Sequence, residues 1–247
     1  MKRLMLCLSI WLAIHVPFAQ CGTGAPPVNY LKAVRGASVA QASDIVNTLE
    51  AIALDNNNLV WNGDKTLLKV VTWKSQSSYE RNLLPYSQTS SSENSVVWVT
   101  LAPTLQRFCR DFRRGHPRAT RAGLDLRLKK RLGMNPNWTY DVFVEMWVSP
   151  TDIFRPCVDP ETSDSRCNVD FGTDIPAVKN IKDYRAFYQN LYFKSYRNAP
   201  GVPWTGLGYT YDWSSPRRKQ GFSEFILSPS TPYVIDRAVP TWDYCEP

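Results

Sequence analysis

The chain has 247 residues, of which 43% are hydrophobic and 21% charged, with a formal net charge of +7. This composition is ordinary for a globular protein, and we find no internal repeat or low-complexity tract. Only His116 remains after residue 20, which excludes zinc and iron sites built on several histidines. The sequence also lacks a phosphate-binding glycine loop, a dinucleotide fingerprint and a Gly-x-Ser-x-Gly motif. We therefore predict no metal and no cofactor.

The first nineteen residues have the pattern of a secretory signal peptide. A basic start, Lys2-Arg3, precedes the apolar run 4–16, and a plausible cleavage site follows Ala19. A lipid anchor on Cys21 is the alternative, but Gln20 is not the small residue that this processing requires. No later apolar run is long enough to cross a bilayer. We predict a signal peptide over 1–19, one globular domain over 20–247, and a secreted or periplasmic location.

Five cysteines follow the predicted signal peptide, and an oxidising compartment would pair most of them. Cys157 and Cys167 enclose a polar, turn-rich loop, so we predict that they form a disulfide. Cys21 and Cys245 lie near the two ends, which are often close together in a compact domain. Pairing these two would leave Cys109 as a free thiol.

The first half of the domain is predicted to contain a helix, a hairpin and a strand. Apolar residues on one face predict a helix over 39–55. The Asn62-Gly63 dipeptide predicts a hairpin turn before a strand over 66–73. Residues 75–94 are polar and serine-rich, which indicates a surface loop. A run of β-branched residues then predicts a strand over 95–101.

The middle of the chain is strongly basic and is predicted to form two short helices. Leu105, Phe108, Cys109 and Phe112 share one helix face, and Leu124, Leu128 and Leu132 share another, with Gly133 as a cap. Between 107 and 131, ten basic side chains oppose only Asp111 and Asp125, a local charge of +8. The ten are Arg107, Arg110, Arg113, Arg114, Arg118, Arg121, Arg127, Lys129, Lys130 and Arg131.

The second half is predicted to mix strands, helices and a structured loop. The predicted elements are a strand over 140–148, one helical turn over 149–152, a helix over 178–191, an aromatic loop over 199–216 that includes a short strand, and strands over 222–227 and 233–235. Separated strands and helices without a βαβ rhythm are typical of the α+β class. We predict a mainly antiparallel sheet with several packed helices, stapled by a disulfide.

Two features point to binding of an anionic partner. The basic helices could contact an acidic glycan, a lipid headgroup or a nucleic acid, although the same charges could simply form solvated helix faces. The predicted anion contacts are Arg110, Arg113, Arg114, Arg118, Arg121 and Lys130. Four aromatic residues in the loop could stack on a sugar or a base, or could instead fix the loop in place. These are Trp204, Tyr209, Tyr211 and Trp213.

Three residues are candidate acid–base groups. His116 lies among cations at the end of a predicted helix, where it could act as a general base or simply cap that helix. Glu224 is flanked by apolar strand residues, and Glu145 lies on the face of its strand opposite the aliphatic residues. Cys109 is predicted on an apolar helix face, which indicates a buried structural thiol rather than a nucleophile.

The run Ser223-Glu-Phe-Ile-Leu-Ser-Pro resembles the glutamate strand of ADP-ribosyltransferase toxins. The likeness covers about a dozen residues. It departs from the family at Phe222, where a second glutamate or glutamine would stand, and the family's early arginine could be Arg35. We do not assign the chain to this family. The resemblance implies an alternative to anion binding, namely a secreted toxin-like enzyme that cleaves NAD or a phosphodiester with Glu224, His116 or both.

Overall fold

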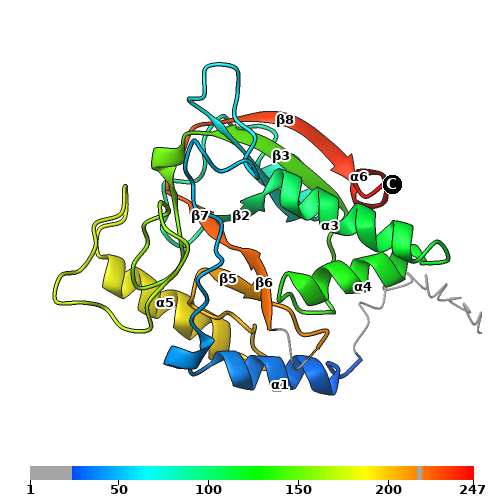
Figure 1. Cartoon of the computed structure of the whole chain (residues 1–247), viewed down its shortest axis with the longest axis horizontal. Coiled ribbons are helices and arrows are strands. Elements are labelled where there is room, and N and C mark those ends of the chain that lie inside the picture. Colours follow the sequence, from blue (N-terminus) through cyan, green and yellow to red (C-terminus); the bar gives the residue numbers. More distant parts are fainter. Residues whose placement is uncertain (1–23, 216–218) are drawn as a thin grey trace, which may run out of the picture.

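A computed structural model describes residues 24–215 and 219–247. The predicted signal peptide and Cys21 lie outside the described residues. A six-stranded antiparallel sheet, in the order β4-β7-β2-β1-β3-β8, forms the centre of the molecule (Figure 1). A separate two-stranded ribbon pairs β5 with β6. The strands are β1 (Leu68–Lys74), β2 (Val97–Leu101), β3 (Val142–Val148), β4 (Ile153–Phe154), β5 (Tyr209–Tyr211), β6 (Gln220–Ser223), β7 (Phe225–Leu227) and β8 (Tyr233–Pro240).

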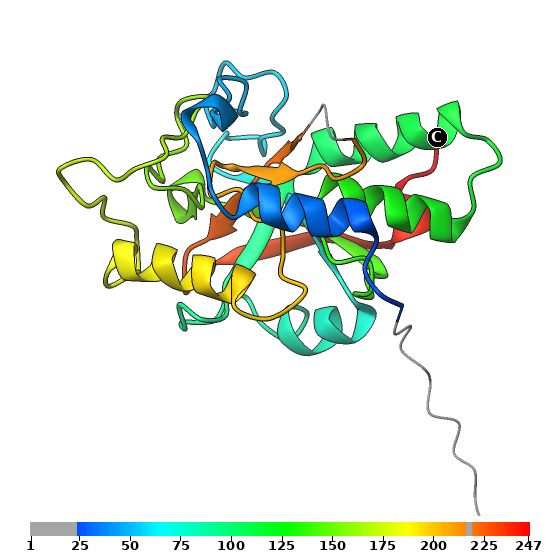
Figure 2. The same cartoon turned by 90° about the horizontal axis from the view of Figure 1, so that it is seen from below.

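The helices lie around this sheet and give the predicted α+β fold. Seen from below, α1 crosses the molecule between α5 at one end and the two green helices α3 and α4 at the other (Figure 2). None of the helices in the described ranges has the length and apolar character that a membrane crossing needs. The helices are α1 (Val28–Ala37), α2 (Gln76–Asn82), α3 (Ala102–Gly115), α4 (Arg121–Arg131), α5 (Tyr184–Tyr196) and α6 (Thr241–Tyr244), with single 3₁₀ turns at Ala42–Asp44 and Pro150–Asp152.

The two faces of the sheet are packed differently. Side chains alternate between faces along each strand, so Leu68 and Val70 of β1 join one continuous core, while Val71 and Trp73 point to the opposite face. That opposite face carries two cores instead of one. The first packs β1 and β3 against α3, α4 and α6, and the second packs Trp98 and Ile226 against α5. The candidate functional site lies where these two cores meet.

The basic segment folds as predicted. Helices α3 and α4 turn Leu105, Cys109, Leu124 and Leu128 inward, and each is almost completely buried. Gly133 follows α4 with a φ of +67°, the left-handed backbone that caps a helix. A Cβ there would lie 3.1 Å from the backbone nitrogen of Tyr211, so glycine also permits the close approach of β5.

The predicted helix over 39–55 is wrong. Only a single turn forms there, at Ala42–Asp44, and the chain then runs extended. The backbone nitrogens of Leu49 and Ile52 donate to the carbonyls of Ser165 and Thr162, which replaces the hydrogen bonds of a helix. Leu49 packs in a core with the two sulfurs of the disulfide loop. Tertiary contacts with that loop therefore override the local helical spacing.

Two other boundaries differ because side-chain caps fix them. The predicted loop 75–94 contains α2, whose first turn is capped by the Ser75 hydroxyl accepting from the Ser78 nitrogen. The predicted helix over 178–191 begins instead at Tyr184, because Asp183 caps it through the Ala186 nitrogen. The sequence analysis also missed α1 entirely.

Two disulfides cross-link the described chain. The predicted Cys157–Cys167 bridge is confirmed. The second bridge joins Cys109 to Cys245, so the possible pairing of Cys21 with Cys245, and the free Cys109 that it would leave, do not occur. The inward position of Cys109 on α3 brings it to α6, where Tyr244 and Cys245 are buried in the same core.

We expect the Cys109–Cys245 bridge to stabilise the protein more than the Cys157–Cys167 bridge. Their sequence separations are 136 and 10 residues, and a longer loop restricts the unfolded chain more. On the chain-entropy model, double Cys→Ser replacement should cost about 5 kcal/mol for the first pair and about 3 kcal/mol for the second. Denaturant unfolding of the oxidised proteins measures both values. A larger loss from the Cys157–Cys167 pair would contradict this ranking.

Candidate functional site

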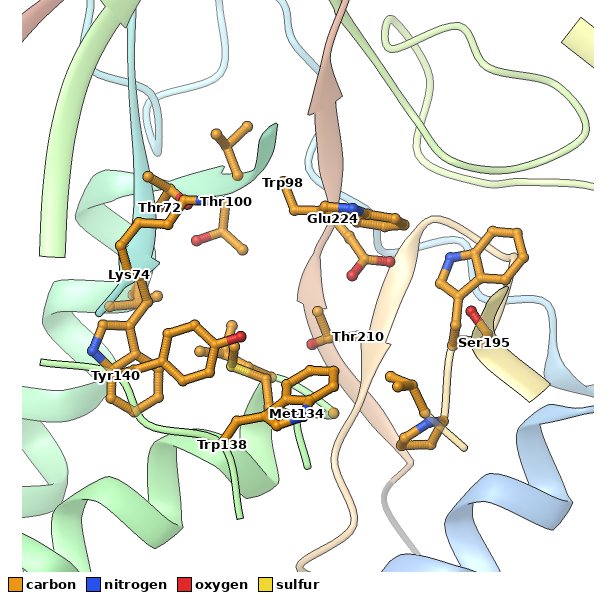
Figure 3. A pocket seen from close by; sticks show the side chains of 18 of the residues that line it. Thr72, Lys74, Trp98, Thr100, Met134, Trp138, Tyr140, Ser195, Thr210 and Glu224 are labelled. Carbon is orange, nitrogen blue, oxygen red and sulfur yellow. The ribbon is translucent and has the colours of Figure 1, made fainter. Parts of the chain in front are cut away.

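A cavity of about 410 Å³ lies on the face of the sheet that carries the two cores. Residues of β1, β2, β5 and α5 line it, together with the segment that follows α4, which includes Met134 (Figure 3). This volume is in the range that accommodates small organic molecules. The sheet and the two helical layers thus leave a partly open cavity where they meet.

Aromatic rings make up much of the cavity wall. Trp73 stacks on Tyr140 with ring centroids 5.1 Å apart, and Trp138 lies 6.4 Å from the same tyrosine. On the α5 side, Trp98 meets Trp204 edge to face at 6.4 Å. All five of these rings line the cavity. Because each ring also packs against a neighbour, the walls are preorganised for a flat or apolar molecule.

Glu224 projects into this cavity from the junction between β6 and β7 (Figure 3). Its neighbours Ser223 and Phe225 point the other way, because side chains alternate along an extended chain. Phe225 enters the continuous core, and the Ser223 hydroxyl accepts from the Glu50 nitrogen at 2.7 Å. The backbone nitrogen of Glu224 donates to the Gly208 carbonyl at 2.9 Å. Both strands and the β5 loop therefore fix the direction of this carboxyl group.

The Glu224 carboxyl group has no compensating cation. Burial raises its pKa to about 8, and no cation lowers it again. Its Oε2 is covered and has no hydrogen-bond partner in the described ranges. A carboxyl group in an apolar surrounding keeps its proton because the charged form loses its hydration. At neutral pH the cavity therefore contains a neutral acid that can donate a hydrogen bond.

Two further polar atoms of the cavity are buried without partners among the described residues. They are the Thr100 hydroxyl on β2 and the Trp204 indole nitrogen. More than nine-tenths of buried polar groups in proteins have a hydrogen-bond partner, and leaving one unpaired costs about 1–3 kcal/mol. Three residues that line one cavity therefore each have a polar atom whose burial is not compensated by a described partner.

The other two predicted catalytic residues do not line this cavity. Glu145 is buried on β3, where Arg237 binds it through two hydrogen bonds of 2.7 and 2.9 Å and the Tyr244 hydroxyl donates at 2.8 Å. Glu145 on β3 pairs with Val71 on β1, and Val71 pairs with Thr100 on β2. Beyond β2 in the sheet lies β7, which begins directly after Glu224. Three strand spacings therefore separate the two glutamates, or about 14 Å between backbones.

His116 lies at the C-terminal end of α3 and is exposed. Its ring stacks on Phe112 with centroids 4.4 Å apart, and Nδ1 lies 2.9 Å from the Phe112 carbonyl oxygen. This is the capping role that the sequence analysis offered as its alternative. Arg35, named from the toxin resemblance, is exposed on α1 and does not line the cavity. The predicted catalytic residues thus do not converge.

The basic helices are partly neutralised by the fold. Arg127 and Arg131 pair with Asp212, Lys129 with Asp125, and Arg114 with Asp111, at 2.7–3.3 Å. Other cations pack on aromatic rings. Arg113 lies 3.7 Å from the Trp242 ring centroid and Arg121 5.3 Å from it, while Lys130 lies 5.5 Å from that of Trp213. In the described ranges, Arg107, Arg110 and Arg118 have neither an ion pair nor a ring contact.

The aromatic loop contributes to the core. Tyr209, Tyr211 and Trp213 are 3%, 8% and 3% exposed, and Trp213 packs edge to face on Tyr30 of α1. Their rings therefore fix the loop, the alternative that the sequence analysis left open. Trp204 differs from them because its ring borders the cavity.

Sequence reasoning missed most of the cavity. Trp98 and Thr100 occupy a strand that was predicted correctly, but their direction toward a cavity depends on which helices cover that face. Lys74 at the end of β1 also lines the cavity and was not singled out. The sequence did single out Glu224, because a glutamate between apolar strand residues must face either water or a cleft.

Comparison with protein-family models, with curated proteins and with solved structures finds no match to this chain. The functional argument therefore rests on the geometry of the cavity.

We expect Glu224 to lower stability as the pH rises. The unfolded carboxyl group ionises near its ordinary value of 4.5, whereas the folded one keeps its proton until about 8. Between these values the folded state binds more protons, so each pH unit removes up to about 1.4 kcal/mol of stability. The stability of a Glu224→Gln variant relative to the wild type should therefore increase from pH 5 to pH 8.

Denaturant unfolding at several pH values tests this expectation. Glu80→Gln, at an exposed position on α2, is the matched control and should show no such gain. A difference between Glu224→Gln and the wild type that stays constant from pH 5 to pH 8 would mean that Glu224 is not held neutral.

Proposed function

We propose that this protein binds a small aromatic or otherwise flat organic molecule in the cavity beneath its central sheet. The observation that carries the proposal is that three residues lining one cavity with aromatic walls, Glu224, Thr100 and Trp204, each have a buried polar side-chain atom without a partner among the described residues. A ligand that paired with them would remove the cost of leaving them buried and unsatisfied.

The donors of the cavity define the polar side of the ligand. Protonated Glu224 and the Trp204 indole both donate hydrogen bonds, and the Thr100 hydroxyl can donate or accept. The ligand should therefore carry an acceptor, such as a carbonyl, ether or hydroxyl oxygen. The body of the ligand would stack on rings such as Trp98 and Trp138, which suits a planar group.

Binding accounts for the cavity better than hydrolysis does. Glycosidic cleavage ordinarily uses two carboxyl groups about 5–10 Å apart. Glu224 is the one carboxyl group among the described cavity residues, and no histidine lies with it. Burial also raises the pKa of Glu224 to about 8, so this carboxyl group does not supply a negative charge at neutral pH.

The predicted anion-binding surface on the basic helices stays a separate prediction. Binding there would rest on charge, because the loop aromatics that were to add stacking are buried. Export likewise stays a prediction. The two disulfides are typical of proteins that fold in an oxidising compartment.

We expect Thr100→Val to stabilise the free protein and to weaken ligand binding. The change removes an unpartnered buried hydroxyl and keeps the side-chain shape, so it should raise stability by about 1 kcal/mol. It also removes one hydrogen bond to the ligand. Indole-3-acetamide, a flat neutral probe with a carbonyl acceptor, should then bind several-fold less tightly by calorimetry.

Thr104→Val is the matched control. The Thr104 hydroxyl is also buried and unpartnered in the described structure, but this residue of α3 does not line the cavity. It should raise stability similarly and leave probe affinity unchanged. Equal effects of the two variants on affinity, or no detectable binding of the probe to the wild type, would contradict the proposed function.

A further inference from the structure

We propose that the ligand of this cavity is an anion, and that Lys74 binds its negatively charged group inside the cavity. This inference rests on the proposed function and adds the charge of the ligand to it.

Lys74 occupies the boundary between two hollows. It ends β1 and lines the inner cavity together with Trp138 and Tyr140 (Figure 3). The same three residues also line a shallow outer groove of about 470 Å³, which runs over Ser75, Ser78 and Asn137. The inner space is largely aromatic, whereas the groove is lined by hydroxyl and amide groups. The Lys74 side chain runs from this boundary toward Thr72 and Thr100, so a molecule bound in the inner cavity could place a charged group beside the Lys74 ammonium group (Figure 3).

The Lys74 ammonium group has no protein anion to pair with. Among the described residues, no carboxylate forms an ion pair with it. Asp141 is bonded to the Lys74 backbone, since its nitrogen donates to the Lys74 carbonyl, but its carboxylate accepts from the Gln76 nitrogen at 3.1 Å. Burial lowers the pKa of Lys74, because its charged form is partly removed from water without a partner.

The charges around the cavity favour an anion as that partner. Glu224 is neutral below about pH 8. The other ionisable residues of the wall are Lys194 and Tyr140, and Lys194 donates to the Asn94 amide oxygen at 3.0 Å, which leaves its positive charge in place. Burial holds the Tyr140 hydroxyl neutral by raising its pKa to about 12. The described wall therefore carries positive charge and no negative charge at neutral pH.

Three probes that share one ring system but differ in net charge test the inference. Indole-3-acetate, indole-3-acetamide and tryptamine carry charges of −1, 0 and +1 on the same indole. Calorimetry at pH 6.5 should give the acetate an affinity about tenfold higher than the amide, which corresponds to about 1.4 kcal/mol, with tryptamine weakest. Lys74→Met should reduce the preference for the acetate over the amide to within about twofold, and Lys74→Arg should keep it.

Two control variants assign the effect to one side chain. Lys32→Met, at an exposed position on α1, removes the same charge away from the cavity and should leave the preference unchanged. If Lys194→Met rather than Lys74→Met abolished the preference, the assignment to Lys74 would be wrong. Equal affinities for the three probes would overturn the inference and leave the proposed function standing, whereas absence of binding by all three would overturn both.

Discussion

The division of one sheet face into two separate cores is the constraint on which the site depends. Helices α3, α4 and α6 cover β1 and β3, while α5 covers β7 and the start of β2. Each layer packs well by itself, and neither extends over the boundary. Because the strands are continuous beneath both layers, the side chains of Thr100 and Glu224 at that boundary meet a cavity instead of a core.

This arrangement explains why a glutamate is tolerated inside the fold. A charged carboxylate without a partner is too costly to bury, so Glu224 keeps its proton and behaves as a neutral hydrogen-bond donor. Glu145 shows the contrasting solution on the same face, since Arg237 and Tyr244 satisfy both of its oxygens. Both oxygens of Glu145 are thus bonded within the structure, whereas Oε2 of Glu224 has no partner among the described residues.

The sequence predicted the elements whose signal is local. Regular alternation identified the strand at 140–148, and helical spacing identified the two basic helices with their caps. It failed where distant contacts decide the structure. Residues 39–55 have helical spacing, yet they run extended because the disulfide loop binds their backbone. The pairing of Cys109 with Cys245 depends on how α3 meets α6, which no spacing of cysteines can reveal.

The residues of the candidate site also divide into those that have a local sequence signal and those that do not. Glu224 could be selected because its apolar neighbours require an unusual position, whereas Thr100 and Lys74 carry no local mark. The aromatic loop was singled out for its composition, but Tyr211 and Trp213 pack against α1, and Tyr209 packs in the core of the disulfide loop. Charge counting overestimated the basic helices as a free surface, because Asp212 approaches Arg127 and Arg131 from more than eighty residues away.

The most direct test of the central claim is the carbon-13 signal of the glutamate side-chain carboxyl groups while indole-3-acetamide is added. The account predicts that the Glu224 signal shifts with saturation as the probe binds, and that the Glu145 signal does not move, because its oxygens are already bonded. A Glu224 signal that stays constant while the probe binds elsewhere would contradict the assignment of this cavity as the binding site.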